Sequence, residues 1–193
     1  MYVCIGTTAL VFGFNLSLTD DNSITLPFSW STWYDVSGFS GEILDFSVDW
    51  GDDTVESYGS DSSSDTVVSH SYTEVPDHLI EIQITGQVER INFDAVSASA
   101  AALVTIPNLG SATIGMYPGW FEGCTALQSI TASQPVLNSA DDGLVDTKEM
   151  FKDCTSFNSD LSHWDTSSVR LFIFFNFFFS FFLWIIKVIR EGY

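Results

Sequence analysis

The stretch MFKDCTSFNSDLSHWDTSSV, residues 150–169, spaces its large side chains regularly among small polar residues and contains no obvious catalytic group. An earlier stretch, WFEGCTALQSI (120–130), has the same spacing. Phe121 aligns with Phe151 and Cys124 with Cys154, and the offset along the chain is the same for both pairs. A fixed offset over several positions indicates an internal repeat, in which each unit leaves an apolar face for a stacked neighbour to cover. We therefore expect two successive coils with their large residues inside.

The second copy is very similar to the repeat M-F-x-x-C-x-x-F-N-x-D-L-S-x-W-D-x-S-x-V of the BspA-like leucine-rich-repeat surface proteins. This resemblance implies an incomplete leucine-rich-repeat solenoid. The first copy lacks the N-x-D-L-S-x-W-D half, and its offset exceeds the usual repeat length, so we expect an inserted loop within residues 131–147. The matching residues are Met150, Phe151, Cys154, Phe157, Asn158, Asp160, Leu161, Ser162, Trp164, Asp165, Ser167 and Val169.

Most polar residues of this repeat have short side chains. Within the resemblance, we expect Asn158, Asp160 and Asp165 to form turns by bonding backbone amides between rungs, as short polar side chains do at tight corners. Cys124 and Cys154 occupy equivalent positions. A ladder of reduced, inward-facing thiols is the simpler interpretation, and a disulfide between the two is the alternative.

Residues before the repeat alternate between apolar and polar with a period of two. In ILDFSVDW, Leu44, Phe46, Val48 and Trp50 lie in phase against polar neighbours. The turn-forming stretches GDD, GSDSSSD and VPD separate such segments, which predicts an antiparallel β-sandwich. The other residues that we expect to be in phase are Ile24, Leu26 and Phe28; Val68, His70 and Tyr72; and Ile80, Ile82 and Ile84.

The segment VDWGDD (48–53), followed by SHSYTEVPDHLIEIQITG, resembles the polycystic-kidney-disease (PKD) domain, in which a D-W-G-D-G turn precedes an H-x-Y strand. Trp50 can fill the gap between two sheets, and Gly51 permits a bend closed to other residues. His70 and Tyr72 match the H-x-Y strand. Asp53 stands where that family has Gly, and PDH replaces its PG. A PKD-like domain often precedes BspA-type repeats, as it would here.

Three acidic residues gather at this turn. Asp49 and Asp52 can cap it through side-chain bonds to backbone amides. Asp49, Asp52 and Asp53 also form a candidate calcium site, because hard cations require several carboxylate or carbonyl oxygens at one point. No spaced loop of oxygen ligands follows them, so turn capping is the preferred interpretation.

Composition limits the function classes. The chain has 193 residues and is 46% hydrophobic, which is enough for a buried core. Residues 1–169 contain 24 acids and only three bases, a charge of 3 − 24 = −21, which argues against a nucleic-acid partner. No G-x-S-x-G, H-E-x-x-H or phosphate-binding glycine loop occurs, and no histidine has a recognised nucleophile partner. We expect neither enzymatic activity nor a cofactor other than calcium.

The two ends are hydrophobic. Residues 1–9 suggest an export signal but have no Lys or Arg before the apolar stretch. The alternative is that residues 9–18 form a first strand with Phe12, Phe14, Leu16 and Leu18 in phase. In the Phe-rich tail, 170–193, Leu171 to Ile186 would span about 24 Å as a helix. Residues 171–189 could thus anchor the chain in a membrane, or the tail is non-native, from a frameshift, a retained intron or a truncated gene model.

The sequence thus predicts a mainly β chain with four segments. These are an N-terminal segment (1–9), a PKD-like antiparallel sandwich (10–94), an incomplete array of BspA-like repeats (95–169) and a hydrophobic helix or non-native tail (170–193). The resemblances imply a non-catalytic binding or adhesion module, extracellular or on a cell surface, with protein or glycan ligands. A structural spacer and a truncated fragment of a larger surface protein are the alternatives.

Overall fold

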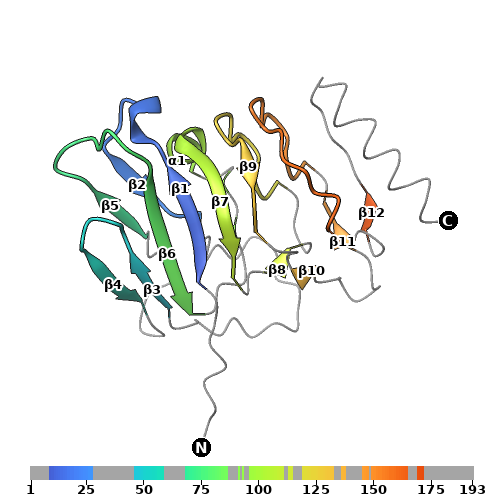
Figure 1. Ribbon diagram of the computed structural model, residues 1–193, viewed down its shortest axis with the longest axis horizontal. Helices are drawn as coiled ribbons and strands as arrows, with labels where there is room; N and C mark the ends of the chain where they lie inside the picture. The colour runs from blue at the N-terminus through green and yellow to red at the C-terminus, as the bar shows by residue number, and fades with distance from the viewer. Residues whose placement is uncertain are drawn as a thin grey trace, which may run out of the picture.

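The chain is mainly β (Figure 1). The computed structural model describes residues 9–27, 46–58, 68–86, 91, 93, 96–110, 113–114, 119–132, 136–137, 145–147, 149–164 and 169–171. Phe28, Leu44, Asp165, residues 1–8 and residues 172–193 lie outside these ranges, so the predicted signal and most of the predicted anchor do too. In the described part, no helix is both long and apolar enough to cross a membrane.

Short strands dominate the order of elements. The six strands of the main sheet are β1 (Leu10–Phe14), β3 (Phe46–Asp49), β4 (Val55–Tyr58), β6 (Ile80–Gly86), β7 (Leu103–Leu109) and β9 (Ser129–Ile130). The remaining elements are β2 (Ser23–Thr25), β5 (Ser69–Ser71), β8 (Thr113–Ile114), β10 (Val136–Leu137), β11 (Val145–Asp146), β12 (Val169–Leu171), the 3₁₀ turn η1 (Leu16–Leu18) and the helix α1 (Ser97–Ala102).

The main sheet is mixed and has the strand order β4-β3-β6-β1-β7-β9. All its neighbours are antiparallel except β7 and β9, which run parallel, with Thr105 opposite Ser129 and Ile106 opposite Ile130. Figure 1 shows β6, β1 and β7 side by side in the middle of the molecule and β9 beyond them. The central position of β1 means that residues from both sides of the predicted boundary at 94 share one sheet.

The alternation predicted from the sequence is present in β6 and in the segment that contains β3. In β6 the isoleucines 80, 82 and 84 are buried while Glu81, Gln83 and Thr85 are exposed. Phe46, Val48 and Trp50 likewise point into the core, and Asp49 points to solvent. Side chains with a period of two alternate between the faces of a sheet, so one face of these strands packs inward.

The first strand is shorter than predicted. Phe12, Phe14 and Leu16 are fully buried, but the side chain of Leu18 is 52% exposed, so its assignment to the apolar phase was wrong. The strand ends at Phe14 because Asn15 caps a 3₁₀ turn, its side-chain oxygen accepting a bond from Ser17 N at 3.1 Å. Such a local cap competes with continuation of the strand.

A second, two-stranded sheet consists of β2 and β5, with Ile24 opposite His70. Ile24, Val68 and Tyr72 join the same hydrophobic core as the main sheet. That core also includes Phe121, Phe151 and the other buried residues of the two repeat copies. The predicted sandwich region and the predicted repeats are therefore in continuous contact.

Residues 131–147, in which we expected a loop, contain two short strands. β10 pairs in parallel with β8, and β11 pairs in parallel with β12. β12 ends at Leu171, so this strand continues into the segment that we assigned to the tail. The two parallel pairings join segments that are separated by nearly the same length of chain, as the coils of a winding chain would be.

Candidate functional site

The turn between β3 and β4 holds the residues of the PKD-like signature. Gly51 has a φ of 80°, and an added Cβ would lie 2.9 Å from the carbonyl oxygen of Glu81, so no other residue fits without a shift. Asp49 accepts a bond from Gly51 N at 3.0 Å, and Asp52 accepts one from Thr54 N at 3.1 Å. Both caps predicted from the sequence are present.

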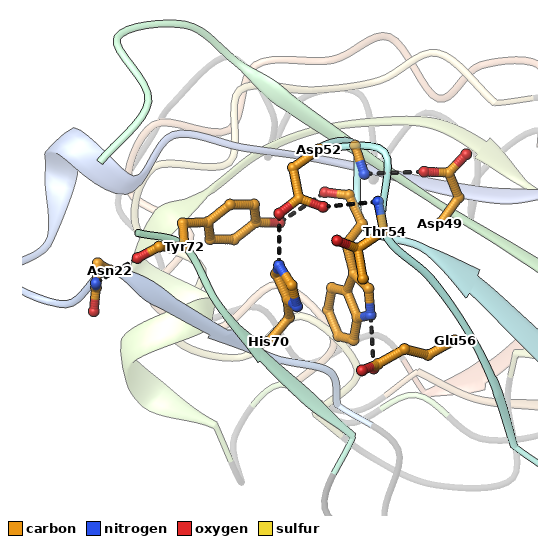
Figure 2. A network of polar contacts seen from close by, with 9 residues as sticks. Asn22, Asp49, Asp52, Thr54, Glu56, His70 and Tyr72 are labelled. Atoms are coloured by element: carbon orange, nitrogen blue, oxygen red, sulfur yellow. Dashed lines mark hydrogen bonds and ion pairs between the residues drawn. The ribbon is translucent and has the colours of Figure 1, made fainter. Parts of the chain in front are cut away.

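Figure 2 shows how β5 brings His70 and Tyr72 to this turn. The His70 ring stacks on Trp50 with a centroid distance of 5.1 Å, and it meets the edge of Tyr72 at 4.8 Å. Its Nε2 atom lies 2.7 Å from Asp52 Oδ2. The Tyr72 hydroxyl donates to the carbonyl of Trp50 at 2.8 Å. The two halves of the signature, which are distant in the sequence, therefore form one cluster.

Two further residues complete the cluster, and neither was predicted from the sequence. Glu56 of β4 accepts bonds from Trp50 Nε1 at 2.9 Å and from the Tyr58 hydroxyl at 2.6 Å. Asn22, just before β2, donates from its side chain to the carbonyl of Tyr72 at 2.6 Å (Figure 2). Glu56 lies just beyond the turn recognised in the sequence. The signal for it in the sequence was the tryptophan itself, because the indole N–H of a buried tryptophan usually requires a hydrogen-bond partner.

The cluster shifts the pKa values of its acids and tyrosines. Burial would raise the pKa of Asp52, but the bonds from His70 and Thr54 outweigh it and hold that pKa below its usual value. The bond from Tyr58 lowers the pKa of Glu56, against the effect of burial. Burial, and to a smaller extent the charge of Asp52, raises the pKa of Tyr72. Asp52 and Glu56 are therefore held ionised and Tyr72 is held neutral.

This arrangement fixes the turn against β5 and leaves its polar groups engaged with one another. The oxygens of Asp49 and Asp52 that would serve calcium already accept bonds from Gly51, Thr54 and His70. Throughout the described ranges, no three His, Cys, Asp or Glu side chains come together as a metal site requires. Calcium binding at Asp49, Asp52 and Asp53 stays a prediction.

The two repeat copies lie against each other in register. Phe121 N donates to Met150 O at 2.9 Å, and Gly123 N donates to Lys152 O at 2.9 Å. Further along, Asn158 N donates to Gln128 O at 3.0 Å. These backbone bonds join positions that are separated by a nearly constant length of chain, as expected for successive coils. Figure 1 shows the second copy as the loop of chain beyond β9.

The aligned phenylalanines share one interior. The Phe121 and Phe151 rings stack with centroids 5.5 Å apart and planes at 24°, and Phe151 stacks in turn on Phe157 at 4.5 Å. Met150, Leu161 and Trp164 are also buried, while Phe157 is partly buried. The large residues of the repeat thus line the inside of the coils, as the spacing predicted.

The aligned cysteines are buried thiols. The Cys154 Sγ donates to the carbonyl of Phe121 at 2.9 Å, which adds another bond between the coils. Burial raises the pKa of Cys124 and raises that of Cys154 to about 12. Thiols with such pKa values are protonated and unreactive near neutral pH. The ladder of reduced thiols is therefore what the structure contains.

Polar side chains add bonds at the outer turns. Lys152 pairs with Glu122, its counterpart in the first coil, and this bond raises the pKa of Lys152. Asp160 accepts a bond from Ser162 N at 2.8 Å, so it caps a turn as predicted, but this bond is local and does not join the two coils. The coil-to-coil bond of Asn158 comes from its backbone N–H.

A family comparison bears on this second region. Residues 120–179 match the family described as "Mycoplasma protein of unknown function, DUF285". No curated protein and no solved structure matched the chain. The DUF285 match spans both stacked copies and is consistent with a BspA-like surface protein, while it leaves residues before 120 unassigned.

Proposed function

We propose that this chain is a non-catalytic binding or adhesion module of a secreted or cell-surface protein, built from a PKD-like sandwich and the start of a BspA-type leucine-rich-repeat solenoid. The observation that carries the proposal is the stacking of the two Phe-x-x-Cys copies, with Phe121 and Phe151 rings 5.5 Å apart. The DUF285 match over the same residues supports it. Stacked repeats typically present an extended surface to partners.

The exposed positions of the coils define a candidate binding surface. Thr125 and Thr155 are equivalent and exposed, as are Gln128 and Asn158. Their hydroxyl and amide groups can both donate and accept hydrogen bonds. Such rows suit the hydroxyls of a glycan or the backbone of a protein ligand. The strongly acidic chain, with 24 acids against three bases over residues 1–169, disfavours nucleic acid and other polyanionic ligands.

Arrays of glycans and extracellular-matrix proteins, probed with the full chain, test this function. We expect selective binding that the double substitution Gln128→Arg and Asn158→Arg abolishes. Ser57→Arg is the matched control, because Ser57 is exposed on β4 at the opposite edge of the main sheet and should leave binding intact. Turnover of glycosidase or protease substrates by the purified chain would contradict a non-catalytic role.

A structural spacer is the second candidate function. The observation that favours it is the continuous main sheet, in which β1 pairs with β6 on one side and with β7 on the other. A continuous sheet holds its two ends at a fixed separation. A spacer would bind nothing on either array, whereas a fragment without independent function would fail to unfold cooperatively when residues 10–169 are prepared alone.

A further inference from the structure

A third segment, F-D-A-V at 93–96, parallels F-E-G-C at 121–124 and F-K-D-C at 151–154 in sequence. In all three, the backbone N–H of the fourth residue donates to the carbonyl of the phenylalanine. These bonds measure 3.0 Å for Val96, 3.1 Å for Cys124 and 3.2 Å for Cys154. The same backbone bond between the first and fourth residues therefore occurs once more, upstream of the recognised repeat.

Phe93 also contacts the first recognised copy in the way that the two copies contact each other. Phe93 N donates to Trp120 O at 3.1 Å, just as Phe121 N donates to Met150 O. The Phe93 ring lies 6.3 Å from Phe121, with an interplanar angle of 35°. Phe93, Phe121 and Phe151 thus form one continuous ladder of rings.

The helix α1 explains why the sequence pattern is hard to see. Val104, Gln128 and Asn158 are linked in series, because Gln128 N donates to Val104 O and Asn158 N donates to Gln128 O. The chain from Phe93 to Val104 is longer than the chain from Phe121 to Gln128 by roughly one turn of a helix. α1 occupies the place where the other copies have a tight turn.

The upstream coil is joined to the N-terminal region by four separate contacts. Its strand β7 pairs with β1 along one edge and with β9 along the other. Asn15 N donates to Ala102 O at 2.8 Å, and Thr25 N donates to the buried Ser99 hydroxyl at 2.8 Å. At the base of the ladder, Phe12 meets Phe93 edge to face at 5.5 Å.

We infer that residues 91–109 are a divergent first copy of the repeat, and that the N-terminal sheet is the cap on which the coils assemble. Each coil leaves an apolar face open, so a stack needs a covered end. Here β1 and Phe12 cover the first coil. The stack of coils therefore depends on the N-terminal sheet for its stability, whatever ligand the protein binds.

The buried thiols provide a direct test in the full chain. The chain has one further cysteine, Cys4, and its replacement by serine leaves Cys124 and Cys154 as the only thiols. In this Cys4→Ser background, labelling of the two thiols is followed at increasing urea, with and without Val48→Ala. Val48 is fully buried in β3, which β6 and β1 separate from β7. We expect this distant truncation to speed the labelling of both thiols to the same extent, roughly tenfold. Unchanged labelling of Cys154, with hydrogen exchange in β6 accelerated, would show that the coils are stable by themselves and would overturn the inference.

A double-mutant cycle tests the equivalence of the coils with mild substitutions that keep the fold. Phe93→Leu and Phe121→Leu should couple by roughly two- to tenfold in the unfolding equilibrium constant, as contacting aromatic rings do. Phe93→Leu and Phe151→Leu are the control pair, because Phe121 lies between them in the ladder, and their effects should multiply within about twofold. Coupling as small in the first pair as in the second would contradict the assignment of residues 91–109 as a repeat copy.

Discussion

The Trp50 cluster and the stacked coils hold their chain segments together in different ways. Around Trp50, specific side chains from distant segments bond to one another, as His70 does to Asp52 and Tyr72 does to the Trp50 carbonyl. In the coils, backbone bonds recur at a nearly constant offset, and the rings of Phe121 and Phe151 stack inside. The cluster therefore depends on residue identity, whereas the coils depend on spacing and on the size of the inward residues.

The backbone of the coils illustrates that tolerance. Gly119 and Gly123 have φ values of 78° and 80°, and their counterparts Glu149 and Asp153 have values of 59° and 62°. The same left-handed turns thus occur with glycine in one copy and with acidic residues in the next. Because the local geometry is set by the coil, a residue that strains it by about 1 kcal/mol is accepted.

The largest effect should follow truncation of the ring at the centre of the ladder. Phe121→Ala should lower the free energy of unfolding by about 3–5 kcal/mol, because Phe121 is fully buried between Phe93 and Phe151. Urea denaturation followed by tryptophan fluorescence measures the loss. Phe157→Ala is the control, since Phe157 is only partly buried and should cost clearly less. Equal losses of unfolding free energy for the two variants would contradict the proposal that Phe121 lies at the centre of the stack and Phe157 at its end.

The Trp50 cluster should be sensitive to a single hydroxyl. Tyr72→Phe removes the donor to the Trp50 carbonyl and leaves that acceptor unsatisfied in the core, which should cost about 1–3 kcal/mol. Tyr58→Phe also removes one hydroxyl, but Glu56 keeps its bond from Trp50. This variant should therefore lose less stability than Tyr72→Phe. Thermal unfolding of both variants compares them, and a larger loss for Tyr58→Phe would contradict the cluster's assigned role.

Acid should destabilise the protein through the Trp50 cluster. A carboxyl whose pKa is lowered by folding stabilises the protein above its unfolded pKa and loses that contribution as the pH falls through its folded pKa. Asp52 and Glu56 both have lowered pKa values, so this loss is expected below about pH 4. Asp52→Asn should cost about 1 kcal/mol at pH 7 and flatten the acid side of the stability curve.

The matched control for this pH profile is Asp20→Asn, which removes the same charge from an exposed site before β2. The free energy of unfolding of both variants is measured by urea denaturation from about pH 2.5 to about pH 7, which spans the pH range in which Asp and Glu side chains titrate. If the free energy of unfolding falls as steeply at acid pH for Asp52→Asn as for the unaltered chain, Asp52 does not cause the acid sensitivity.

The smallest effects should come from the left-handed turns of the coils. Gly123→Ala should cost about 1 kcal/mol through its φ alone, because nothing lies within 4 Å of an added Cβ. The opposite change, Asp153→Gly, should be neutral to within about 1 kcal/mol, since relief of strain is offset by a more flexible unfolded chain. Melting temperatures of the two variants check this, and a large loss for Asp153→Gly would show that its side chain has a role beyond the turn.

Local patterns in the sequence predicted local structure well. The alternation in LIEIQITG gave strand β6 with its buried face, and the Phe-x-x-Cys spacing gave the stacked rings. The pairing of β1 with both β6 and β7 could not be read in the same way, because its partners lie far away along the chain and no local signal specifies them.

The misses have physical causes of the same kind. Phe93 was not recognised because its coil has Val96 in place of cysteine and a helical turn inserted before its strand. Glu56 and Asn22 were missed because the groups that they bind, an indole N–H and a backbone carbonyl, come together only in the folded chain. For Phe93, the F-x-x-V spacing at 93–96 was the one signal that the sequence offered.

Proximity of the aligned phenylalanines tests the central claim most directly. In a chain with isotopically labelled phenylalanine rings, nuclear Overhauser spectroscopy should give a cross-peak between Phe121 and Phe151, whose centroids lie 5.5 Å apart. A second cross-peak should join Phe93 and Phe121. If Phe151 shows cross-peaks to other residues but none to Phe121, the two segments are not successive coils, and the repeat architecture proposed for this protein is wrong.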